Sequence, residues 1–96
     1  MIIARFGVRA KPQWAEEMAA ALAAVEAPSR AIPGVVHFDV ARSLTDPHAF
    51  VVLEVFADRE AFVQQNEQAE VAAVLALVPV GALTGNFEFS TWETED

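Results

Sequence analysis

The sequence predicts an α+β fold, an antiparallel sheet in β-α-β-β-α-β order with its helices on one face, which is the ferredoxin-like arrangement. Segments rich in apolar, β-branched and aromatic residues predict strands over residues 2–9, 35–43, 49–56 and 86–92. Segments with helical spacing of apolar residues separate the first strand from the second and the third from the fourth. A chain of 96 residues is expected to form a single domain over residues 1–96.

The first helix is predicted after a break at residues 11–13, where Pro12 interrupts the strand. Its apolar residues fall on one stripe, namely Trp14, Met18, Ala21, Leu22 and Val25. Pro28 is expected to end or kink this helix, because proline lacks the N–H that a helix needs. Pro33-Gly34 then predicts a turn before the second strand.

The second half of the chain begins with a hairpin, whose turn is predicted at Thr45-Asp46-Pro47. After the third strand, Asp58 is a good helix N-cap and predicts a short helix through about Gln65. A longer helix should follow and stop at Pro79. Its apolar spacing comes from Val71, Val74, Leu75 and Val78.

Composition narrows the range of partners. The net charge is -8, and a negative field repels phosphates, so neither nucleic acid nor an anionic membrane is expected as a partner. No apolar run reaches the roughly 18 residues of a membrane span. The N-terminus resembles a strand rather than a signal peptide, so a cytoplasmic protein is expected. There is no cysteine for thiolate chemistry, and His37 and His48 lack ligand-like spacing, so no metal site is expected.

The apolar strand at residues 50–56 carries one carboxylate, Glu54. A lone acid near the end of a buried strand, just before a helix, is a candidate pocket residue. Glu54 could equally lie at a sheet edge or in a structural ion pair. The polar run at residues 64–66 leaves a similar choice, because its amides could bind a ligand or form a solvated corner, and the solvated corner is favoured.

Side-chain alternation predicts that both faces of the sheet are covered. One face should be wholly apolar, with Ile2, Ala4, Phe6, Val8, Val36, Phe38, Val40, Val51, Leu53, Val55, Phe87 and Phe89. The other mixes apolar and ionisable residues, whereas a solvated face would be polar at nearly every second position. Helices should cover one face and a second copy the other, which predicts a homodimer through the sheet, with Trp92 as a candidate contact.

The expected hairpin register brings three ionisable residues together. If the loop is residues 44–47, Ser43 faces His48 and His37 lies opposite Glu54, close enough to interact. Arg5 lies on the first strand, which should neighbour the third. An acid beside a histidine can serve as a general base, and an arginine can hold a developing oxyanion. The alternative is a buried ion network without chemistry.

Four segments carry a family resemblance: Ser29–Gly34, Phe38–Val40, Arg42–Pro47, and Phe50–Glu54 with Phe56, Asp58, Glu60 and Ala61 after it. In order and spacing they resemble the antibiotic biosynthesis monooxygenase (ABM) domain family across nearly the whole chain. The resemblance implies a dimeric α+β barrel. It also implies oxygenation of a small aromatic quinol, phenol or anthrone without a cofactor, in which a protein base deprotonates the substrate and the resulting carbanion or enolate reduces O₂ directly.

The resemblance assigns roles to particular residues. Glu54 matches the family's recurrent strand acid, and Glu54 or His37 would accept the proton while Arg5 would hold the oxyanion. Gln65 lies at a pocket position of the family, and Gln65 and Asn66 would be the polar contacts to substrate. The apolar walls would be Phe56, Phe62, Val71 and Leu75.

The chain departs from the family pattern where many relatives carry two histidines, since it has Gln65 and Glu70 there. Haem-degrading relatives have asparagine, tryptophan and histidine where this chain has Arg5, Gln65 and Leu75, so haem breakdown is not expected. These departures favour an alternative function, a non-catalytic domain that binds a small molecule. An isomerase of a small metabolite is a further alternative, but six Lys and Arg residues in all offer few groups to meet an anion.

Overall fold

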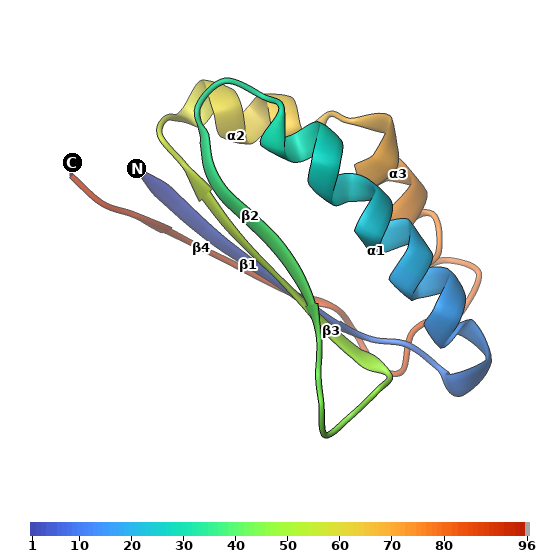
Figure 1. The fold of residues 1–96 in the computed structure, drawn as a ribbon. Coiled ribbons are helices and arrows are strands. Elements are labelled where there is room, and N and C mark those ends of the chain that lie inside the picture. Colours follow the sequence, from blue (N-terminus) through green and yellow to red (C-terminus); the bar gives the residue numbers. More distant parts are fainter. Residues whose placement is uncertain (96) are drawn as a thin grey trace.

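The chain folds into two layers, a four-stranded antiparallel sheet and a layer of helices that covers one of its faces (Figure 1). The computed structural model describes residues 1–95. Its elements are β1 (Ile2–Arg9), a 3-10 turn (Pro12–Trp14), α1 (Ala15–Arg30), β2 (Val35–Arg42), β3 (Ala49–Phe56), α2 (Arg59–Asn66), α3 (Ala69–Leu75) and β4 (Glu88–Glu93). The sheet order β2-β3-β1-β4 confirms the predicted ferredoxin-like fold.

Two helix ends differ from the prediction. Helix α1 continues through Pro28 to Arg30, because Pro28 lies close to its end and the N–H of Ala31 still reaches the carbonyl of Ala27 at 3.2 Å. Helix α3 stops at Leu75, short of Pro79. Beyond it the N–H groups of Leu77 and Val78 bond three residues back, which tightens the chain into turns. Strand β4 also begins and ends later than expected, at Glu88 and Glu93.

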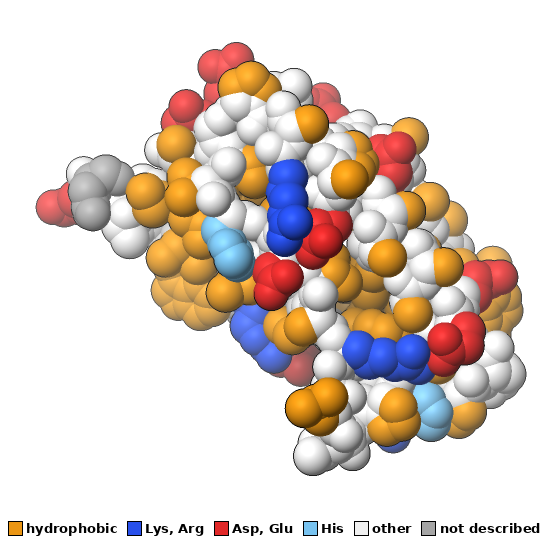
Figure 2. Space-filling model, viewed as in Figure 1, with side chains coloured by type: hydrophobic (Ala, Val, Ile, Leu, Met, Phe, Trp, Pro, Cys, Tyr) orange, Lys and Arg blue, Asp and Glu red, His pale blue; other side chains and the backbone are white. Residues whose placement is uncertain are grey.

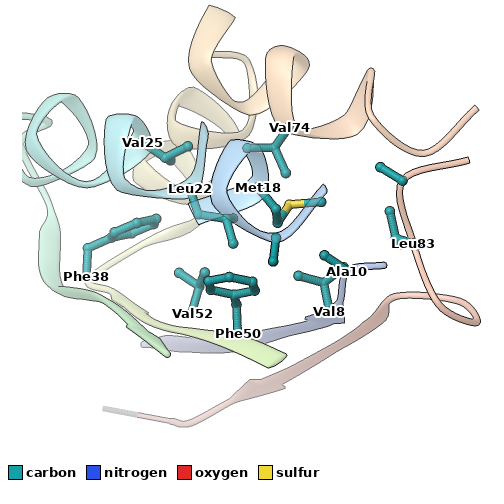
Figure 3. Close-up of a cluster of buried hydrophobic side chains, with 12 residues drawn as sticks. Val8, Ala10, Met18, Leu22, Val25, Phe38, Phe50, Val52, Val74 and Leu83 are labelled. Atoms are coloured by element: carbon teal, nitrogen blue, oxygen red, sulfur yellow. The ribbon is translucent and has the colours of Figure 1, made fainter. Parts of the chain in front are cut away.

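The main core lies between α1, α3 and the sheet (Figure 3). Met18, Leu22 and Val25 of the predicted α1 stripe are buried there. Trp14 and Ala21, also on the stripe, are partly buried and pack against the same core, so the stripe prediction is confirmed. At the other end of α1, Gly34 turns the chain with φ 92°, and a Cβ there would lie 2.9 Å from that of Ala61, so the turn requires glycine.

The β2–β3 hairpin has a loop one residue longer than predicted. The N–H of Ser43 donates to the carbonyl of Ala49 at 3.0 Å, which leaves residues 44–48 as the loop. Within it the Ser43 hydroxyl accepts from the N–H of Asp46 at 3.1 Å, and the Asp46 carboxylate accepts from the N–H of His48 at 3.2 Å. These side-chain bonds stabilise a turn that strand alternation alone does not reveal. The extra residue shifts β2 by one position against β3.

The shift corrects the predicted faces. Glu54 pairs with Phe38 on β2 and Ala4 on β1, so Phe50, Val52, Glu54 and Phe56 point to the helices. Val51, Leu53 and Val55 move to the other side, because a slip of one residue exchanges the faces of a strand. We call that side the open face; it carries Ile3, Arg5, His37, Asp39, Val51, Leu53, Val55, Ser90 and Trp92.

The open face is not covered by any element of residues 1–95 (Figure 1). Leu53 is 44% exposed and Trp92 is 52% exposed. Figure 2 shows hydrophobic side chains gathered on the left flank, while acidic groups are scattered over the helix layer. Within the described chain, no helix is both long enough and apolar enough to cross a membrane.

Candidate functional site

A cavity of about 200 Å³ lies between the helix layer and the sheet. All four strands and all three α-helices contribute to its lining. The lining residues are Phe6, Leu22, Val25, Phe38, Val52, Glu54, Gln65, Asn66, Val71, Val74, Leu75, Phe87 and Phe89. Apart from Glu54, Gln65 and Asn66 these side chains are apolar, so a bound molecule would contact mainly apolar surface.

Glu54 is the ionisable group of this cavity. Strand β3 lies between β2 and β1 in the sheet, so Glu54 is not at an edge, and the residue is only 5% exposed. Among residues 1–95 it forms no ion pair and no hydrogen bond through its side chain. Burial therefore raises the pKa of the Glu54 carboxyl to about 7. A carboxyl that changes protonation near neutral pH can accept a proton from a bound ligand and return it.

Gln65 contributes an amide to the same cavity. The Asp58 carboxylate accepts from the N–H of Ala61 at 2.9 Å and fixes the start of α2. Nearly two turns after Asp58, Gln65 points inward and is 3% exposed. The favoured solvated corner is therefore wrong for Gln65, because the register of α2 directs it into the interior, against Ser29 of α1. Its neighbour Asn66 is exposed at the rim, where its side chain donates to the carbonyl of Phe62.

The predicted convergence of Arg5, His37 and Glu54 is wrong. Arg5 pairs with Leu53 and His37 pairs with Val55, so both side chains lie on the open face. Glu54 lies on the helix face. The longer hairpin loop is the physical reason, because it moves His37 away from the position opposite Glu54. No cationic residue lines the described cavity.

The structure also corrects two of the predicted wall residues. Phe56 and Phe62 do not line the cavity but pack together in a second cluster with Ile2, Ala4 and Ala61. Their ring centroids are 5.3 Å apart in an edge-on arrangement. Val71 and Leu75 do line the cavity, on α3.

Among the residues in or beside the cavity, Phe87, Phe89 and Ser29 are not predicted from the sequence as parts of the site. Phe87 and Phe89 form a wall beside Phe6, and the Phe6 and Phe87 ring centroids lie 5.5 Å apart. Ser29 is fully buried and contacts Gln65. The α1 stripe contained the signal for Ser29, since Leu22, Val25 and Ser29 follow one another at helical spacing on the buried side.

The chain is similar to known proteins in both sequence and structure. A family model described as "Antibiotic biosynthesis monooxygenase" matches residues 1–77. A candidate monooxygenase of this kind from Deinococcus radiodurans is similar in structure, with TM-score 0.86 and 17% identity, covering 100% of this chain and 94% of that one. Another from Nitrosomonas europaea gives TM-score 0.86 at 20% identity over 100% of both chains.

A protein from Pseudomonas aeruginosa gives TM-score 0.83 at 22% identity and covers 99% of this chain and 94% of its own. Identities this low establish a likeness of fold alone. No curated protein matches the sequence.

Proposed function

Because the chain belongs to the antibiotic biosynthesis monooxygenase family, we propose that it oxygenates a small aromatic quinol, phenol or anthrone without a cofactor. One observation carries the proposal. Glu54 is a buried carboxyl with no protein partner among residues 1–95, its pKa is raised to about 7, and it lines an otherwise apolar cavity. An acid of this kind is suited to act as a general base on a bound ligand.

The proposed reaction on an anthrone begins when Glu54 removes a proton from the acidic CH₂ or its enol. The resulting enolate gives an electron to O₂, and the two radicals combine to form a C–O bond as a hydroperoxide. Loss of water from the hydroperoxide, with the proton returned by Glu54, leaves a carbonyl group. The balance is one substrate CH₂ and one O₂ converted into one C=O and one H₂O. The apolar walls keep water from the intermediate.

The charge of the cavity favours a neutral substrate. Its lining contains the Glu54 carboxyl and two amides, with no lysine, arginine or histidine. A carboxylate or phosphate on the ligand would be buried without a cation, which is costly. Arg5 and His37 stay on the open face, so the proposal assigns them no role inside this cavity. Phe38, Phe87 and Phe89 offer faces for an aromatic ring.

We also propose that two copies associate through the open face. Leu53 and Trp92 are about half exposed at its surface, and Ile3 and Val55 lie beside them in the strand register. Burying such a strip stabilises the dimer by about 25 cal/mol for each Å² of apolar area removed from water. A two-fold dimer matches one open face to another.

The test is oxygen consumption with a panel of hydroquinones and anthrones at pH 8. We expect uptake with at least one panel member and a loss of at least about 100-fold in Glu54→Gln, since removal of a general base typically has an effect of this size. Glu88→Gln is the matched control, because Glu88 is an exposed acid on β4 opposite Gly7. It should leave the rate within about twofold.

Two results would overturn the proposal. One is that no panel member supports oxygen uptake by the wild-type protein. The other is that Glu54→Gln is as active as Glu88→Gln, in which case the base lies elsewhere.

A second candidate function is binding of an aromatic metabolite without conversion. Gln65 and Glu70 at the two positions where many relatives carry histidine favour it. Ligands that raise the melting temperature of the protein without any oxygen uptake would support this function over oxygenation.

A further inference from the structure

Behind the cavity, three polar side chains form a hydrogen-bonded chain that joins α1 to both short helices. The Gln65 Nε2 group on α2 donates to the Ser29 hydroxyl on α1 at 3.2 Å. The Ser29 hydroxyl donates to Oε1 of Gln68, the residue that precedes α3, at 3.0 Å. Ser29 is fully buried, Gln65 is 3% exposed and Gln68 is half-buried.

The direction of this chain fixes the direction of the Gln65 amide. A serine hydroxyl has one proton to donate, and here Ser29 gives it to Gln68, so toward Gln65 it can only accept. The amide N–H₂ of Gln65 is thereby held against Ser29. The Gln65 carbonyl oxygen accepts no hydrogen bond within residues 1–95. No fully enclosed polar side-chain atom of those residues lacks a partner, so the Gln65 oxygen is not fully enclosed. The cavity that Gln65 lines is the space available to it.

We propose that Ser29 and Gln68 are positioning residues that hold the Gln65 carbonyl toward the cavity, so that the site selects aromatic ligands that donate a hydroxyl over ligands that only accept. This inference rests on the proposed function of the cavity. It sharpens the substrate class, because a quinol, a phenol or the enol form of an anthrone carries the O–H that Gln65 can bind. A quinone product has only carbonyl oxygens, which would face the Gln65 oxygen without a proton between them. The orientation of the Gln65 carbonyl therefore also favours product release.

The closing experiment compares two probes of similar shape, 2-naphthol as the donor and 2-methoxynaphthalene as an acceptor only. Their dissociation constants are measured by titration calorimetry with the whole chain at pH 8, where Glu54 is mainly ionised and can accept from 2-naphthol to the same extent in the wild type and in every Gln68 variant. We expect the wild-type protein to bind 2-naphthol about tenfold more tightly, since an unpaired buried acceptor costs about 1–3 kcal/mol.

Two substitutions at Gln68 distinguish a role in orienting the Gln65 amide from a purely structural role. In Gln68→Glu the carboxylate can only accept, so Ser29 must still donate to it and the preference for 2-naphthol should persist. In Gln68→Leu the serine proton is free to turn to Gln65 and the amide can reverse, so the preference for 2-naphthol should fall at least about fivefold below that of the wild type. Taking the ratio of the two probes in each variant cancels the difference in their size. Thermal unfolding verifies that both variants are folded.

Each outcome decides a different point. Loss of the preference in Gln68→Glu, or its retention in Gln68→Leu, would overturn the positioning role. If oxygen uptake with quinols is intact in those same proteins, the proposed function still stands. Absence of binding of either probe to the wild-type protein, together with absence of oxygen uptake, would overturn the inference and the proposed function together.

Discussion

Leu53 and Glu54 are neighbours on β3, yet they have exchanged the environments that their side chains would prefer. The acid is 5% exposed under the helices, while the leucine is 44% exposed on the open face. Strand geometry forces them to opposite sides of the sheet, and the hairpin register decides which residue goes to which side. The comparison of the helix-covered face with the open face therefore shows that each face carries one costly feature, an uncompensated acid in one case and bare apolar surface in the other.

Costs of this kind are informative because a sequence selected only for stability would remove them. A buried acid without a partner is disfavoured by desolvation. An exposed apolar strip forgoes the free energy of burial. We interpret the first as the sign of a ligand site and the second as the sign of an association surface. The two interpretations predict different responses to substitution on the two faces.

The largest expected difference comes from two adjacent residues of β2. Phe38 is 2% exposed and lies in the main core, whereas His37 is exposed on the open face. Phe38→Ala should lower the free energy of unfolding by about 3–5 kcal/mol through cavity formation. His37→Ala should change it by less than about 0.5 kcal/mol. Urea unfolding at low protein concentration measures both. A cost for His37→Ala near that of Phe38→Ala would mean that the open face is buried in the folded unit.

The next effect concerns the pH dependence of stability at Glu54. The folded-state pKa is raised from 4.5 to about 7, so the folded protein binds the Glu54 proton more tightly than the unfolded chain does. This contribution to stability is fully present below about pH 4.5 and is lost as the pH rises through about 7. At pH 8, Glu54→Gln should therefore be more stable than the wild type by at most about 3 kcal/mol.

Unfolding curves at pH 4, 6 and 8 measure this difference. Glu88→Gln serves as the control, because the exposed Glu88 should give a nearly constant difference from the wild type across the same pH range. An equally flat difference for Glu54→Gln would show that water reaches the Glu54 carboxylate freely, and the argument for a buried base would fail.

How far the sequence could predict the molecule depends on the range of each interaction. The apolar, β-branched run at residues 50–56 and the cap at Asp58 are local signals, and the structure confirms both elements. The register of β2 against β3 depends on how Ser43 and Asp46 fold the hairpin loop, which side-chain alternation does not contain. An error of one residue in this register places His37, instead of Phe38, opposite Glu54.

The site shows the same division. Glu54 stands out in the sequence as a lone acid in an apolar strand. The pocket position of Gln65 comes instead from the family resemblance, because the residues alone favour a solvated corner there. Phe89 is not predicted as a cavity residue, because its place there arises only when β4 packs beside β1 in the fold. Ser29 lies on the buried stripe of α1, but its contact with Gln65 depends on how α1 and α2 meet, which no local pattern contains.

A charged substitution on the open face is expected to weaken association of the two copies without unfolding the monomer. Leu53→Lys places a cation in the proposed dimer interface and should weaken association by about 100-fold, as for a hot-spot residue. The monomer should unfold within about 0.5 kcal/mol of the wild type, because Leu53 is already 44% exposed there. Sedimentation velocity over a concentration series measures the dissociation constant. A wild-type protein that stays monomeric at micromolar concentration would remove the proposed dimer.

The smallest expected effect tests how the helix layer is held over the cavity. The Asp58 carboxylate satisfies the N–H of Ala61 at the start of α2, the helix that carries Gln65. Asp58→Ala should cost about 1 kcal/mol of unfolding free energy, while Asp58→Asn, which keeps a capping oxygen, should cost only a few tenths. Hydrogen exchange should show faster opening of α2 in the alanine variant and no change in β1 or β3, because those strands bond to each other. Equal stability of the two variants would mean that packing of Ala61 and Phe62 alone holds α2, so that the position of Gln65 depends on the core rather than on the cap.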